Sequence, residues 1–242
     1  MGQRLVQPGV GNPRGHFEDK DFVEFHKELL RSNRSYMYAP RDSLTVNSEY
    51  REKAKRLLQS RLSAGTDWGF KDPRSSLFLP FWKSLLPDAR YLLVYRDPYL
   101  VIDSLFRRKG DWPLYLMFGW AAGAWLRYNS DILKFFLSNQ DYCALVNIGG
   151  FNRNPDVARA AVGRRLGISL DNPYSNVFSP KAISSDKATH YGIYTKLNRL
   201  LFGSSLNALY VDLENHALVN ASGNVDGAEI VQPERASHYA ST

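Results

Sequence analysis

The sequence contains one cysteine, Cys143, so the chain cannot form an internal disulfide bond. Cys143 lies in the apolar run YCALVNI and is expected to be a core residue. A chain without a disulfide framework is typical of a reducing compartment. We therefore predict a cytoplasmic protein whose fold depends on an ordinary hydrophobic core.

Long apolar segments are also missing. The opening segment, MGQRLVQPGVGNPRG, has no apolar central region of the kind found in signal peptides. The most apolar stretch, residues 112–126, contains Pro113 and is followed by Arg127. It is shorter than the roughly 20 residues that a membrane-spanning helix needs, and it is predicted to be a buried helix. We expect no membrane span.

Positively charged residues outnumber negatively charged ones. The 31 Lys and Arg residues outnumber the 24 Asp and Glu residues, which gives a formal net charge of +7. This excess favours an anionic partner over a cationic one, although it equally serves solubility. The basic residues of segment 48–62 spread around a predicted helix, and no nucleic-acid-binding motif is present, so we expect no nucleic acid partner. The histidines have no metal-ligand spacing, and no metal site is predicted.

Short strand candidates alternate with helical patterns along the first 213 residues. The strand candidates are Trp68–Phe70, Tyr91–Tyr95, Cys143–Ile148 and Ala208–Leu213. Helices are predicted for 17–30, 48–62, 75–86, 98–109, 113–138 and 154–168. This alternation predicts an α/β domain over residues 1–213, with a three-layer architecture in which helices cover both faces of a parallel sheet. Residues 214–242 show no clear period and are predicted to be an irregular C-terminal extension.

Two of the predicted strands end in the same pattern. Lys71 follows Trp68–Phe70 and Arg96 follows Tyr91–Tyr95, and each cation precedes an Asp-Pro pair. Asp can cap the next helix and Pro can begin it. Strand-end cations beside helix N-termini favour a phosphate or sulfate, so the pattern predicts Lys71 and Arg96 at one edge of the sheet. The alternative is that both cations form structural ion pairs.

The segment RDPYLVIDSL, in which Ser104 follows Arg96 by eight residues, resembles the 3′-phosphate-binding motif of sulfotransferases that use 3′-phosphoadenosine 5′-phosphosulfate. Segments 12–30, 68–98 and 145–168 also resemble bacterial members of that family, in the same order. The resemblance covers roughly residues 1–170. It implies a fold like that of the P-loop nucleotide hydrolases and 3′-phosphoadenosine 5′-phosphosulfate as the donor substrate.

The resemblance also implies roles for particular residues. Arg96 and Ser104 would hold the 3′-phosphate of the donor, and Lys71 would lie near the transferred sulfuryl group. Glu18 is our first candidate for the general base and His16 is the second, because a base must accept the proton of the acceptor. Glu18 could instead only cap the following helix, and His16 could be a surface histidine. The acceptor would be a hydroxyl of a carbohydrate or a small metabolite.

The chain departs from the family at its start. Sulfotransferases hold the 5′-phosphosulfate in a Pro-x-Ser-Gly-Thr loop between a strand and a helix, and this sequence has no such loop. The segment GVGNPRG has neither a preceding strand nor the G-x-G-x-x-G spacing. We therefore expect the first strand and the P-loop to be missing, with their neighbours exposed or otherwise paired. Two hypotheses remain open: a sulfotransferase impaired in the chain as given, or a non-catalytic relative or fragment that binds a nucleotide phosphate or nothing.

Overall fold

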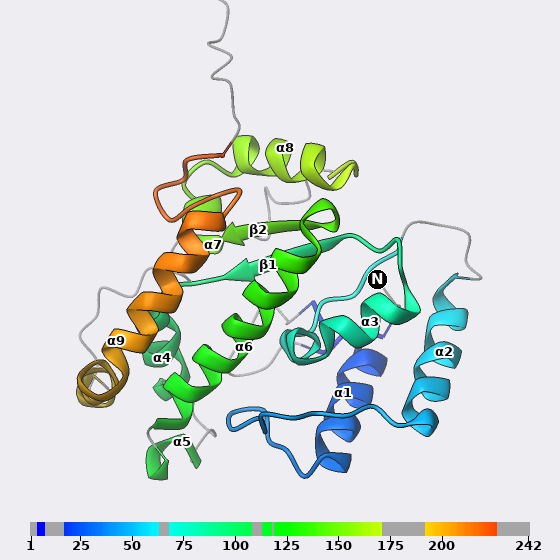
Figure 1. Cartoon of the computed structure of the whole chain (residues 1–242), viewed down its shortest axis with the longest axis horizontal. Coiled ribbons are helices and arrows are strands. Elements are labelled where there is room, and N and C mark those ends of the chain that lie inside the picture. Colours follow the sequence, from blue (N-terminus) through cyan, green and yellow to red (C-terminus); the bar gives the residue numbers. More distant parts are fainter. Residues whose placement is uncertain are drawn as a thin grey trace, which may run out of the picture.

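The computed structural model describes residues 4–7, 17–62, 68–107, 113–117, 119–170 and 192–226. Across these residues the chain is a mixed α/β structure that is mostly helical and contains a small parallel sheet (Figure 1). The α/β class predicted from the sequence is confirmed at this level. No helix in the described ranges combines the length and the apolar character needed to cross a membrane.

The N-terminal part of the chain is a helical layer around an aromatic cluster. It contains α1 (Lys20–Ser32), α2 (Ser48–Leu62), the 3₁₀ helix η1 (Pro73–Phe78) and α3 (Leu79–Leu85). The α2 bounds match the sequence prediction, and α1 begins where the Asp19 side chain accepts the amide N–H of Asp21. The apolar side chains of α1 are buried against α2, α3 and the segment before η1.

The strand predicted for Trp68–Phe70 is wrong, because these residues have no regular structure. Instead of pairing with a strand, their rings join the aromatic cluster. The Phe70 ring stacks on Phe22 with a centroid distance of 3.9 Å, and the Trp68 ring lies 6.0 Å from the same phenylalanine. Three residues offer few ladder hydrogen bonds, so packing of the two large rings decides the local conformation.

The sheet contains β1 (Tyr91–Tyr95) and β2 (Cys143–Asn147), which run parallel with Tyr91 opposite Cys143 and Tyr95 opposite Asn147. The connection holds α4 (Pro98–Phe106), α5 (Pro113–Leu116), α6 (Gly119–Ser138) and the short 3₁₀ helix η2 (Gln140–Tyr142). The long helix predicted over 113–138 is therefore two helices. Both strands lie where the sequence predicts them, because each is a short apolar run between turn signals.

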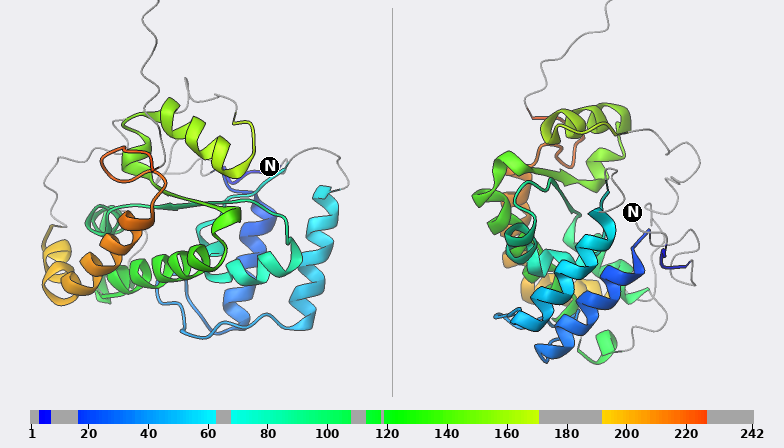
Figure 2. Two further views of the ribbon diagram at one scale, coloured as in Figure 1. Left: turned by 45° about the horizontal axis from the view of Figure 1, so that its top comes forward. Right: turned by 90° about the vertical axis from the view of Figure 1, so that its right-hand side faces the viewer.

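Helices lie on both faces of this small sheet, as the left view of Figure 2 shows. The face that carries Leu93 and Leu145 packs against α4, α6 and α9 (Gly192–His216). On the other face, α8 (Pro155–Leu166) covers Ala144 and Val146 of β2. On that same face the β1 side chains Leu92 and Val94 remain 47% and 43% exposed. Parallel sheets are usually covered on both faces, so this part of β1 is unusually open.

The strand predicted for Ala208–Leu213 is also wrong, because these residues belong to α9. Leu206 and Leu213 recur two helical turns apart and are fully buried in the main core, so tertiary packing selects the helix. The helix continues past residue 213, where the C-terminal extension was predicted to begin. Beyond it, Leu218 donates its amide N–H to the Leu145 carbonyl, so residues 217–226 follow β2 and extend the fold.

Candidate functional site

The first part of the candidate site is the corner between β1 and α4, where Arg96 follows the strand; Ser104 lies further along α4, in its second half. Asp97 caps α4 by accepting the Leu100 amide N–H at 2.9 Å, and Pro98 occupies the first helical position. The indole N–H of Trp125 donates to the Arg96 carbonyl at 3.0 Å and fixes the backbone at the end of the strand. The sequence prediction of a strand, a strand-end arginine and an Asp-Pro helix start is therefore confirmed here.

This corner holds two guanidinium groups. Arg96 is half-buried; burial lowers its pKa, and the neighbouring charge of Arg107 lowers it further. Asp97 and Asp103 act in the opposite direction, and Arg107 pairs with Asp103 at 2.9 Å. Ser104 is half-buried on α4 between Asp103 and Leu105. A phosphate at this corner can accept charge-assisted hydrogen bonds from the Arg96 guanidinium.

Glu18 and Lys71 form the second part of the candidate site, and the structure brings them together. The Lys71 ammonium donates to Glu18 Oε1 at 3.0 Å, and Nη2 of Arg74 lies 4.0 Å from the other carboxylate oxygen. Glu18 is buried, whereas the Lys71 side chain is 56% exposed. This ion pair agrees with the structural role that the sequence left open for Lys71, and the exposed ammonium retains access to solvent.

Asp72, His26 and Trp82 form a buried series of hydrogen bonds next to the Glu18–Lys71 pair. Asp72 Oδ2 is 2.8 Å from His26 Nδ1, and the Trp82 indole N–H donates to His26 Nε2 at 3.0 Å. Because Nε2 accepts a hydrogen bond, the proton of neutral His26 lies on Nδ1 and is donated to Asp72. Burial raises the pKa of Asp72, but the hydrogen bond from His26 and the electrostatic interactions with His26 and Arg74 lower it below its usual value. The sequence predicts Asp72 as a helix cap or as the partner of a neighbouring cation; the one signal for its pairing with His26 is a histidine on the apolar face of α1.

The two parts of the candidate site lie on different helices and strands. Glu18 and Lys71 lie beside α1 and η1, whereas Arg96 and Ser104 lie at β1 and α4. Lys71 follows an irregular segment and not a strand, so the structure does not reproduce the shared sheet edge predicted for Lys71 and Arg96. His16, the second candidate base, lies outside the described residues.

A carboxylate from α9 occupies the region beyond the strand ends. Glu214 Oε1 accepts hydrogen bonds from the Tyr95 hydroxyl and the Asn147 amide, both at 2.7 Å, and Oε2 accepts the Ala221 amide N–H at 2.7 Å. Burial raises the pKa of Tyr95, and the hydrogen bond to Glu214 raises it further. Burial, with Glu214, also raises the pKa of Tyr210 to about 12.

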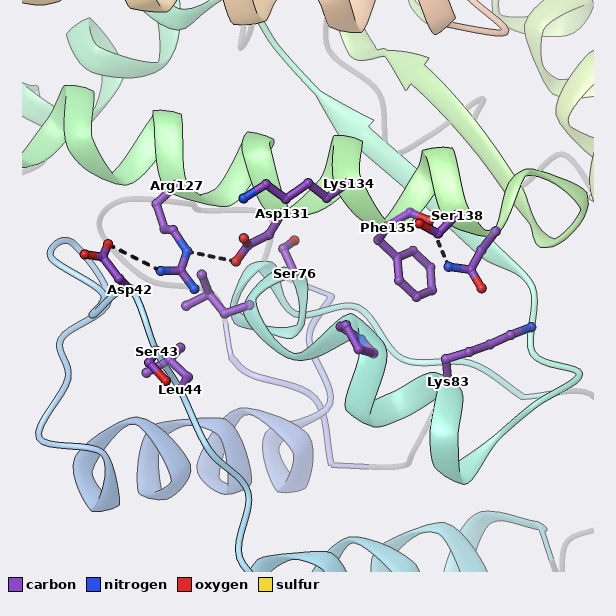
Figure 3. Close-up of a pocket in the computed structure, with 13 residues that line it drawn as sticks. Asp42, Ser43, Leu44, Ser76, Lys83, Arg127, Asp131, Lys134, Phe135 and Ser138 are labelled. Atoms are coloured by element: carbon purple, nitrogen blue, oxygen red, sulfur yellow. Dashed lines mark hydrogen bonds and ion pairs between the residues drawn. The ribbon is translucent and has the colours of Figure 1, made fainter.

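A separate groove of about 610 Å³ lies between α6, the η1–α3 segment and residues 42–44 (Figure 3). Arg127 is placed between two carboxylates, with Asp131 at 2.9 Å and Asp42 at 3.8 Å. Lys83 and Lys134 add two more cations. None of the residues predicted from the sequence lines this groove. Its charges are of both signs, as are those at the Arg96 corner, where Asp97 and Asp103 lie near the two arginines.

Comparisons with known proteins add no family assignment. No protein-family model matches the chain, and neither curated proteins nor solved structures give a significant match. In the ranges that the structure describes, no group of three or more His, Cys, Asp or Glu side chains is placed to hold a metal ion. The geometry of the Arg96 corner and of the Glu18–Lys71 pair therefore carries the functional argument.

Proposed function

We propose that this chain is a sulfotransferase-like protein that binds the 3′-phosphate of 3′-phosphoadenosine 5′-phosphosulfate at the Arg96 corner. The observation that carries the proposal is a half-buried strand-end arginine, next to a second arginine, on a strand–helix unit with Ser104 on its helix. Charge-assisted hydrogen bonds from a guanidinium to a phosphate are among the stronger polar contacts in proteins. Ser104 would add a hydroxyl contact to the same group.

The transfer step in this proposal uses Lys71 and Glu18. Lys71 would leave its ion pair and stabilise the negative charge that develops on the bridging oxygen as the sulfur–oxygen bond to the donor breaks. Glu18, released from Lys71, would accept the proton of the acceptor hydroxyl. The exposed ammonium of Lys71 supports such a movement, since it needs no opening of the core. The acceptor class remains a carbohydrate or a small metabolite.

The same features support impaired transfer by the chain as given. The sequence has no recognisable 5′-phosphosulfate loop. Without that loop, in-line positioning of the sulfuryl group fails. The second candidate function is a non-catalytic protein that binds a nucleotide phosphate, and the Glu18–Lys71 ion pair favours it because the pair engages both proposed catalytic groups.

Calorimetric titration with 3′-phosphoadenosine 5′-phosphate tests the binding proposal. Arg96→Ala is expected to weaken binding about tenfold or more, because a hydrogen bond to a charged group contributes about 1.5–3 kcal/mol. Ser104→Ala is expected to weaken it less. Arg90→Ala is the matched control, since Arg90 precedes β1 at the opposite end of the strand and its loss should leave binding unchanged.

The comparison ligand is adenosine 5′-phosphate, which lacks the 3′-phosphate and should bind equally to the wild type and to Arg96→Ala. Equal affinity of the wild type and Arg96→Ala for the 3′-phosphorylated ligand would reject the assignment of Arg96. Binding through Arg96 without turnover, even after a strand–loop–helix segment with a Ser-Gly-Thr loop is fused before Met1, would favour the non-catalytic function.

A further inference from the structure

The groove shown in Figure 3 has no part in the proposed transfer reaction. Its volume of about 610 Å³ lies within the range of about 300–1,000 Å³ that is usual for small-molecule sites. One wall is a single face of α6 from Arg127 to Ser138, which is roughly 16 Å long. The opposite wall comes from the η1–α3 segment and from residues 42–44. The groove is therefore elongated along α6.

Arg127 is held in a fixed orientation at one end of this groove. Its Nε atom donates to Asp131 Oδ2 at 2.9 Å, and its Nη1 atom donates to the Arg41 carbonyl at 2.6 Å. The remaining nitrogen, Nη2, makes no hydrogen bond within the described part of the chain. A guanidinium whose orientation is fixed before a ligand arrives loses little conformational freedom on binding, so Nη2 is a preorganised donor.

Other polar groups of the groove also keep unused hydrogen-bonding capacity. Among the described residues, the Lys134 ammonium and the hydroxyls of Ser43, Ser76 and Ser138 have no partner. Figure 3 shows Ser76 directed from η1 towards α6. Asp42 adds a carboxylate whose distance of 3.8 Å from Arg127 is too long for a hydrogen bond. The groove therefore offers both donors and acceptors to a ligand.

The charges of the groove balance one another. Arg127 and Lys134 are matched by Asp42 and Asp131. The fifth charged residue, Lys83, is directed away from these four and donates to a backbone carbonyl after α3 (Figure 3). An ion of either sign would therefore meet a like charge within the groove. A hydroxyl group has no such conflict, because it can donate to a carboxylate and accept from a guanidinium or an ammonium.

The apolar part of the lining is shallow. Leu44, Leu77, Pro80 and Phe135 contribute to it, but Leu77 and Phe135 are buried and expose little surface. They offer little apolar area to a lipid chain or to the side chain of a peptide, whose anchors normally fill pockets. A sugar ring needs less apolar contact, because its C–H face is small and its hydroxyls lie around the edge. The lining therefore fits a sugar better than a peptide or a lipid.

We infer that the groove along α6 binds a short neutral oligosaccharide. Asp42 and Asp131 accept hydrogen bonds from sugar hydroxyls, Arg127 and Lys134 donate to them, and the Ser76 hydroxyl can do both. The groove shares no lining residue with the Arg96 corner. The inference does not rest on the proposed sulfuryl transfer, and its test contains no nucleotide, so either can fail without the other.

Saturation-transfer difference NMR with the whole chain tests the ligand class. Maltotriose, cellotriose and chitotriose are the neutral probes, and the trimers of glucosamine and of galacturonic acid are their cationic and anionic counterparts. At least one neutral probe is expected to bind saturably, and about tenfold more tightly than either charged trimer. No saturable binding of any neutral probe up to about 10 mM, or binding of a charged trimer as tight as theirs, overturns the inference. Tighter binding of a capped neutral pentapeptide of glycine, serine and leucine would make the groove a peptide site and also overturn it.

Substitutions test whether the sugar binds in this groove. Lys134→Ala is expected to weaken binding of the neutral probe about tenfold, and Ser76→Ala about threefold. Neither side chain makes a hydrogen bond within the described part of the chain, so circular dichroism and the thermal midpoint should stay unchanged. Lys27→Ala is the matched control, since Lys27 is an exposed lysine of α1 away from the groove. Unchanged affinity of both groove variants, or an equal loss in Lys27→Ala, rejects the site.

Discussion

The Asp72 carboxylate accepts two hydrogen bonds and forms an ion pair in the interior, so Asp72→Asn should be strongly destabilising. Its partners are His26 Nδ1 at 2.8 Å, the Arg74 amide N–H at 2.9 Å and the Arg74 guanidinium at 3.1 Å. All three are donor groups. An asparagine side chain offers one acceptor oxygen, and its NH₂ group would face a donor on whichever side it is turned.

His26 cannot relieve this conflict by moving its proton. If Nε2 became protonated, it would meet the indole N–H of Trp82, which already donates to it at 3.0 Å. The substitution therefore leaves at least one buried donor unsatisfied and removes the charge that compensates the buried Arg74. Removing one partner of a buried ion pair costs about 3–5 kcal/mol, and the nearby Glu18 carboxylate favours the lower part of that range.

Urea unfolding is the assay, because a shift of the midpoint at constant slope reports a change in the free energy of unfolding. The expected loss is a large share of the about 5–15 kcal/mol that stabilises a typical domain. Asp88→Asn, the same change at an exposed turn, should alter stability by less than about 0.5 kcal/mol. If Asp72→Asn cost less than about 1 kcal/mol with an unchanged slope, the proposed hydrogen-bond assignment would be wrong.

Three further predictions follow from the same structure. Folding lowers the pKa of Asp72, so the carboxylate contributes its full stability above the unfolded pKa near 3.8 and loses it as the pH falls below that value. The free energies of unfolding of the wild type and Asp72→Asn should therefore converge in acid. A Cβ atom at Gly150 would lie 1.7 Å from the Asn220 carbonyl oxygen, so Gly150→Ala should lower the thermal midpoint, whereas Gly123→Ala, with no atom within 4 Å, should raise it or leave it unchanged. The purified chain should not transfer labelled sulfuryl groups to sugars or phenols above the level of Lys71→Ala, and clear turnover by the wild type alone would show that another segment holds the donor.

Some helices and strands could be predicted because residues close in the sequence largely decide where they begin and end. Helix α2 has the predicted bounds, and α4 begins at the predicted Asp97-Pro98 start. The strands at 91–95 and 143–147 were predictable because each is a short apolar run bounded by turn signals. The position of Arg96 at the end of β1 was predictable for the same reason.

Contacts between distant segments decided the rest. The stacking of Phe70 on Phe22 and the burial of Leu213 override the strand propensity of their segments, since burying a large apolar side chain is worth more than a local preference. The Glu18–Lys71 pair joins residues 53 positions apart, and His26 meets Asp72 across 46 positions. The sequence alone determined which polar residues the chain has and placed Arg96 and Asp97 correctly between a strand and a helix, whereas it misplaced Lys71 and Glu214. Only the tertiary structure decided which of them meet, because a buried polar group must find its partner wherever folding brings one within hydrogen-bonding distance.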